Sequence, residues 1–176
     1  MTINLGGPRP GDYARAQWPV AVYGPKAIYE NILVKLYVKM QALRDTMATG
    51  YDPTFTYVYQ YHYVANLLLN AVTVGIENVD AQEAAGVGPD GVLAFYDITA
   101  SIRVHTAYKN SRINESDNAY LLDQVELYLN QYREIGANYM VQSTFDINPS
   151  VEFSESATSG GEMRIFIQVA RSHEQS

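Results

Sequence analysis

The segment VLAFYDITASIRVHTAY, residues 92–108, alternates apolar and polar side chains almost without a break. One side of this alternation consists of Val92, Ala94, Tyr96, Ile98, Ala100, Ile102, Val104, Thr106 and Tyr108. The other side consists of Leu93, Phe95, Asp97, Thr99, Ser101, Arg103, His105 and Ala107. Period-two alternation predicts a β-strand with one mainly buried face. At roughly 3.3 Å per residue such a strand would be about 56 Å long, whereas a compact chain of this length is only about 40 Å across. The strand must therefore bend within the subunit, or project and pair with another subunit.

The composition fits one domain with a real core and an unusually uncharged surface. The chain has 176 residues, of which 47% are hydrophobic and only 18% are charged. Tyrosine occurs 15 times, against 5 phenylalanines and 1 tryptophan, and its apolar ring with a polar tip suits interfaces between subunits. There is no cysteine, which excludes disulfides, thiolate catalysis and sulfur-rich metal sites. No secretory signal or membrane span is predicted, so we expect a soluble protein made in a cytoplasm.

The net charge of −7 is unevenly distributed. Between Arg44 and Arg103 the chain has no lysine or arginine, although several aspartates and glutamates lie there. An acidic region repels phosphate, so tight binding of a nucleic-acid backbone through this region is not expected. A solvated acidic surface is the simpler interpretation.

Three parts of the chain are predicted. Residues 1–24 are rich in glycine and proline and form an extended arm. Its apolar end is expected to dock on another subunit through Trp18, Val20, Val22 and Tyr23. Residues 25–171 form a single α+β domain, and residues 172–176 form a frayed tail.

The domain is predicted to have a mainly antiparallel sheet with helices packed on one face. A helix begins at Pro25 and ends at Gly50, and alternating residues predict strands over 55–64 and 67–79. A polar, glycine-rich loop is expected over residues 80–91, before the long strand. A second helix, capped by Ser116 or Asp117 and ending at Gly136, precedes two closing strands. The alternating tyrosines of 57–63 are expected to form a cross-strand ladder beneath a helix or against a neighbour.

The sequence predicts no catalytic, cofactor-binding or metal-ligating residue. GVGPDG at residues 86–91 matches a dinucleotide-binding pattern, but a strand follows it where a helix is required. His62 and His105 lie on predicted strands and are possible neighbours across the sheet, where Asp97 would complete an acid/base or metal site. The simpler interpretation is that they are polar residues on the wetter face of the sheet.

This order of elements resembles that of the tail terminator proteins of long-tailed bacteriophages. The resemblance covers residues 25–171, from PKAIYENILVKLYVKMQALRDTM through the quoted strand and NAYLLDQVELYLNQYREIG to MRIFIQVAR. It implies a structural protein of the virion, assembled in the host bacterial cytoplasm, of which six copies form a ring. The ring would cap the finished tail tube and join it to the neck or head, so the partners are further copies, the tail tube protein and a neck or head-completion protein. Because the first 24 residues are long for that family, a related neck or head-completion protein is an alternative.

The resemblance also implies which side chains line the central channel of such a ring. They are those on the polar side of the long strand, namely Asp97, Thr99, Ser101, Arg103 and His105. DNA would pass without specific binding, aided by the acidic excess, and no cofactor or membrane is implied. An alternative from another class is a small-ligand-binding or enzymatic α+β domain, with a pocket lined by tyrosines, His62 and His105.

Overall fold

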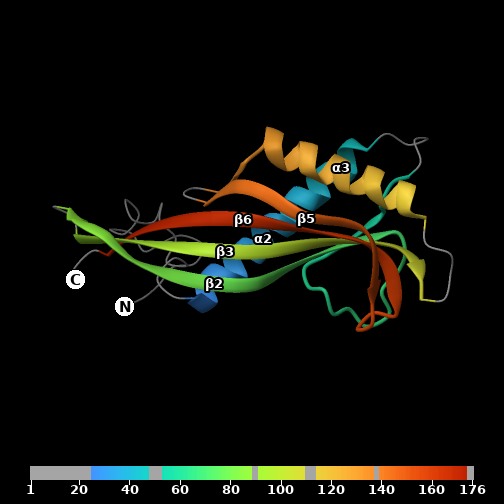
Figure 1. Ribbon diagram of the computed structural model, residues 1–176, viewed down its shortest axis with the longest axis horizontal. Coiled ribbons are helices and arrows are strands. Elements are labelled where there is room, and N and C mark those ends of the chain that lie inside the picture. The colour runs from blue at the N-terminus through green and yellow to red at the C-terminus, as the bar shows by residue number, and fades with distance from the viewer. Residues whose placement is uncertain (1–24, 48–52, 89–90, 110–113, 137–138, 174–176) are drawn as a thin grey trace.

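The computed structural model describes residues 25–47, 53–88, 91–109, 114–136 and 139–173. Two helices and six strands make up this part of the chain (Figure 1). In chain order they are α2 (Pro25–Thr46), β1 (Tyr57–Tyr59), β2 (Ala71–Gly88), β3 (Gly91–Tyr108), α3 (Glu115–Gln131), β4 (Glu134–Gly136), β5 (Tyr139–Phe153) and β6 (Thr158–His173). The predicted α+β class is confirmed. Among the described helices, none is both long and apolar enough to cross a membrane.

The six strands form one mixed sheet in the order β1-β2-β3-β6-β5-β4. The short strand β1 pairs with β2 in parallel, and every other neighbouring pair is antiparallel. The strand that contains the quoted segment, β3, lies between β2 and β6 and pairs with both along nearly its whole length. A strand with two partners satisfies its backbone N–H and C=O groups on both sides. The alternation of its side chains therefore decides what each face of the sheet presents.

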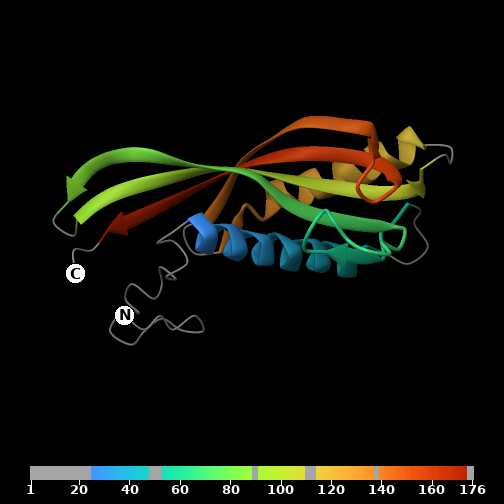
Figure 2. The same ribbon diagram turned by 90° about the horizontal axis from the view of Figure 1, so that it is seen from below.

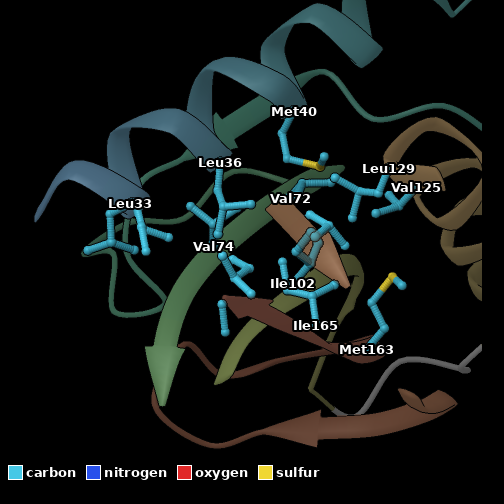
Figure 3. Close-up of a cluster of buried hydrophobic side chains, with 14 of the residues drawn as sticks. Leu33, Leu36, Met40, Val72, Val74, Ile102, Val125, Leu129, Met163 and Ile165 are labelled. Atoms are coloured by element: carbon cyan, nitrogen blue, oxygen red, sulfur yellow. The ribbon is translucent and has the colours of Figure 1, made fainter. Parts of the chain in front are cut away.

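The core lies between one face of this sheet and the layer formed by α2 and α3 (Figure 3). From β3 it receives Ile98, Ala100, Ile102 and Val104, all fully buried, which confirms the predicted apolar side of that strand at these positions. From the two helices the fully buried side chains are Ile32, Leu33, Leu36, Met40, Leu122, Val125 and Leu129. Burying a leucine or isoleucine side chain contributes about 1.5–3 kcal/mol. The sheet and helices thus hold each other in place through their apolar faces.

The helix boundaries differ from the sequence-based expectation. The α2 helix ends at Thr46, and the predicted end at Gly50 lies outside the described residues. The α3 helix is capped by Asn114, whose side-chain oxygen accepts from the Asp117 N–H at 3.3 Å, so the predicted caps at Ser116 or Asp117 were wrong. Asparagine is as good an N-cap as serine or aspartate, so composition alone does not select among the three.

Four strands, not one, are longer than usual. β2 and β3 each have 18 residues, β6 has 16 and β5 has 15. The loop predicted over residues 80–91 was wrong, because β2 continues to Gly88 and pairs with β3 as far as Gly88↔Gly91. The glycines and alanines of this segment have low strand propensity. Pairing with β3 supplies the order that the local sequence lacks.

Three of these strands continue past the rest of the sheet, and Figure 2 shows them reaching beyond the N-terminal end of α2. We call this part the three-stranded extension, made of residues 81–88, 91–95 and 170–173. The pairing of β5 with β6 stops at Tyr139↔Val169, and the pairing of β1 with β2 stops at Thr73. Residues 91–95 of β3 therefore project from the subunit, flanked by β2 on one side and β6 on the other.

The segment predicted as a strand over residues 55–64 is mostly irregular. Only Tyr57–Tyr59 is a strand, and Phe55 and Val58 are the side chains that enter the core. Tyr61 and Tyr63 are exposed, so the tyrosines do not form a ladder beneath a helix, and their packing against a neighbour stays a prediction.

Candidate assembly surface

The sheet has a second face, opposite the helices, which we call the polar face. On β3 its side chains are Asp97, Thr99, Ser101, Arg103 and His105, the residues that the resemblance assigns to a channel lining. Asp97, Thr99 and Arg103 are half-buried, whereas Ser101 and His105 are fully buried. The structure therefore places all five on one face but gives them two different environments.

Two arginines organise the charges on this face. Arg103 pairs with Glu162 at 2.5 Å and also with Glu155, and its guanidinium lies 4.8 Å from the centre of the Phe153 ring. Hydrogen bonding to its own backbone N–H and to Arg103 lowers the pKa of Glu155. The position of Arg103 is therefore held by a carboxylate on each side and an aromatic ring beneath.

The second arginine joins three strands of the polar face. Arg164 of β6 pairs with Glu77 of β2 at 2.7 Å and with Asp146 of β5 at 3.2 Å. It also lies 3.8 Å from Glu162, and the hydrogen bond to Glu77 is the main reason that the pKa of Arg164 is raised. With Arg103, two guanidinium groups face four carboxylates, which leaves a net charge of −2 for the cluster.

Both histidines predicted as neighbours belong to one chain of hydrogen bonds. The Thr73 hydroxyl lies 2.8 Å from His62 Nδ1 and 2.8 Å from His105 Nε2. The other ring nitrogens reach the Ser101 hydroxyl at 2.6 Å and the Thr158 hydroxyl at 2.7 Å. All four ring nitrogens therefore have a hydroxyl partner.

Burial lowers the pKa of both rings, to about 3 for His62 and about 4 for His105, and the nearby Arg103 charge acts in the same direction. Neutral imidazoles bonded only to hydroxyls are poorly placed to exchange protons with a substrate, because a general base works best with a pKa near the working pH. The arrangement suits a structural role in fastening loops to the sheet.

This hydrogen-bond chain explains why two predicted channel residues are wrong. His62, from the segment between β1 and β2, covers Ser101, and the Phe153 ring lies 4.8 Å from the His105 ring. Since Ser101 and His105 are fully covered by their own subunit, neither can line a channel. That Asp97, Thr99 and Arg103 line a channel stays a prediction.

The acid/base or metal site of Asp97 with the two histidines is not formed. Asp97 accepts a hydrogen bond from Gln168 at 3.0 Å, and it lies eight residues from His105 along the strand, or about 26 Å. Within the described ranges, no cluster of three or more histidine, aspartate or glutamate side chains is placed to hold a metal ion. The expected docking residues Trp18, Val20, Val22 and Tyr23 lie outside the described residues.

Sequence reasoning missed the partners that hold these residues. Gly75 leaves the space that the His62 ring fills, because a Cβ at Gly75 would lie 2.5 Å from His62 Nε2. The only trace of this in the sequence is a glycine inside the alternating segment 71–76, which often marks a close approach. The chain matches no model of a known protein family, and no curated protein matches its sequence.

Proposed function

We propose that this protein is a structural component of a bacteriophage virion whose copies close into a ring, six in number. The ring would cap the tail tube and join it to the neck or head. The observation that carries the proposal is the three-stranded extension, which reaches past the helix layer and has free edges on both sides. Within the described chain, residues 81–88 of β2 and residues 170–173 of β6 have no strand partner on the outer side of the sheet.

Free strand edges are normally blunted or covered, because their unpaired N–H and C=O groups pair readily with other chains. Within the described chain, residues 81–88 of β2 pair with β3 on one side and with no strand on the other. The two free edges belong to opposite sides of the same sheet. Contact between unlike surfaces of successive copies generates a ring when the rotation closes.

The polar face suits the lining of a channel for DNA. Its carboxylates outnumber its arginines, and both arginines are engaged in ion pairs. The described part of this surface repels phosphate, because both of these arginines are already paired with carboxylates. In the ring, Asp97, Thr99 and Arg103 would face the channel, and DNA would pass without specific binding.

The first measurement is the mass in solution by light scattering, with negative-stain images of the same sample. Six copies of a 19.7 kDa chain would weigh about 118 kDa. A monomer or dimer at micromolar concentration would contradict the ring.

A shortened variant tests whether the extension makes the ring. Gln82 and Phe95 are register partners, so replacing residues 83–94 by Asn-Gly joins them through a two-residue hairpin turn. The core beneath the sheet is untouched, so the variant is expected to keep its circular dichroism and to become monomeric. A shortened variant that still forms the ring would show that the extension is not the joint.

A further inference from the structure

The outer side of α2 carries an apolar stripe that the core does not use. Val34 and Val38 are 46% and 54% exposed, and they lie one turn apart on α2. Ala42 continues the stripe one turn further on. Valine has a lower helix propensity than alanine, lysine or glutamate, so solvent exposure gives no reason for valine at both positions.

This stripe forms one wall of a groove of about 440 Å³ between α2 and the end of α3. Tyr128 of α3 and Glu134 of β4 form the opposite wall. Lys39 lies between the walls, with its Nζ 5.3 Å from the centre of the Tyr132 ring and 6.0 Å from that of Tyr128. We call this site the α2–α3 groove. Its walls are largely apolar and aromatic, and Lys35 also lines it.

A neutral, extended segment with apolar side chains on one side is the occupant that fits this groove. Residues 18–23, WPVAVY, have no charge and carry apolar side chains at Trp18, Val20 and Val22. Alternate side chains of an extended chain repeat about every 6.6 Å, and residues four apart on a helix repeat about every 6 Å. The apolar side of the segment therefore matches the spacing of Val34, Val38 and Ala42.

The reach of the segment favours the groove of another copy. Val38 lies thirteen residues along α2 from Pro25, or about 20 Å. Trp18 lies seven residues before Pro25 and reaches at most about 24 Å when fully extended. To enter its own groove the chain would have to turn back before Pro25. A four-residue turn would leave about four residues, or roughly 14 Å, of extended chain beyond it, which falls short of Val38.

We propose that residues 18–23 of one copy lie in the α2–α3 groove of the next copy, so that each subunit of the ring is strapped to its neighbour. This inference rests on the proposed ring. It adds a contact on the helix layer to the joint made by the strand edges, which remains the contact that the ring requires.

The absence of cysteine from the chain allows a direct test by disulfide cross-linking. Trp18→Cys and Val38→Cys are made as separate variants, mixed, dissociated and reassembled, and then oxidised. The expected product on a non-reducing gel is a covalent dimer, and the variant with both changes is expected to give a ladder of oligomers. Tyr63→Cys, at a position 73% exposed in the segment between β1 and β2, replaces Val38→Cys as the control and should give no dimer above random collision.

The single tryptophan gives a second readout. The fluorescence emission of Trp18 is expected to shift to the red in Val38→Asp, because the charge expels the ring from the groove. Leu127→Asp, at a site 62% exposed and not in the groove, should leave the emission unchanged. An unshifted spectrum in Val38→Asp would overturn the assignment.

The outcomes separate this inference from the ring itself. A ring of the expected mass without the 18–38 disulfide overturns the strap and leaves the ring standing. A monomer in which the variant with both changes forms an internal disulfide overturns both, because the segment then lies in its own groove.

Discussion

His62 and His105 share one hydroxyl group, because His62 Nδ1 and His105 Nε2 both lie 2.8 Å from Thr73 Oγ1. A threonine hydroxyl has one hydrogen to donate, so at least one of the two facing ring nitrogens must carry a hydrogen. The tautomers of the two rings are therefore linked through Thr73. This link fastens the segment between β1 and β2 to the centre of the sheet.

Thr73→Val tests the shared hydroxyl. Thr73 is fully buried, so the change leaves two ring nitrogens without their partner. We expect the free energy of unfolding to fall by about 2 kcal/mol, since an unsatisfied buried polar group costs about 1–3 kcal/mol. Urea denaturation measures this, with Thr99→Val on the same face as the matched control. Equal losses in the two variants would contradict a special role for Thr73.

The stability is expected to fall as the pH is lowered from 7 to 5. Burial lowers the folded-state pKa of His62 to about 3 and that of His105 to about 4, while an unfolded histidine titrates near 6.5. Below about pH 6.5 the unfolded chain therefore binds protons that the folded chain does not. The slope is up to about 1.4 kcal/mol per pH unit for each histidine.

Urea denaturation at several pH values measures this slope, and His62→Gln is the matched variant. It should remove about half of the dependence between pH 7 and 5 and leave the share of His105. A free energy of unfolding that is flat over this range in the unchanged protein would show that the rings are not buried in the neutral form.

Gly75→Ala is expected to displace the His62 ring. The new Cβ would lie 2.5 Å from His62 Nε2 and 3.2 Å from Cε1, and overpacking of this kind costs typically 1–3 kcal/mol. Residues 60–70 should become sensitive to limited proteolysis, because their contact with the sheet is lost. A double-mutant cycle with His62→Ala isolates the cause. If Gly75→Ala costs as much with His62→Ala as without it, the space left by Gly75 is not used by His62.

Local alternation predicted which face of the sheet each residue of β3 occupies. It did not predict how far along β3 the neighbouring strands would pair with it. Ile98 and Ile102 are buried where the sequence placed them, because a period of two depends only on the strand itself. The continuation of β2 to Gly88 depends on β3 as a partner, and its own glycines and alanines favour a loop. Long-range pairing therefore overrode local preference in the three-stranded extension.

The candidate surface was predictable only in part for a related reason. The sequence allowed His62 and His105 to be neighbours, because both lie on predicted strands. In the structure both rings lie within hydrogen-bond distance of the Thr73 hydroxyl. The burial of His105 depends on Phe153, which lies 48 residues away and folds over it at the end of β5. No local pattern around residue 105 contains that information.

Asp97→Lys tests whether the polar face lines a channel for DNA. The charge reversal at six positions should attract phosphate inside the ring, whereas the mass of the ring should not change. Asp97 is half-buried and accepts a hydrogen bond from Gln168 of its own subunit, so we do not expect ring formation to depend on it. Asp123→Lys makes the same charge change on the exposed side of α3 and is the matched control.

DNA inside a ring must enter by a free end, so linear and covalently closed circular duplexes distinguish the two positions. Asp97→Lys is expected to bind linear DNA more tightly than circular DNA, with an affinity that falls steeply as salt rises. Asp123→Lys should bind both forms equally. Loss of the ring in Asp97→Lys, with no change in DNA binding, would place Asp97 at a contact between subunits and not in the channel.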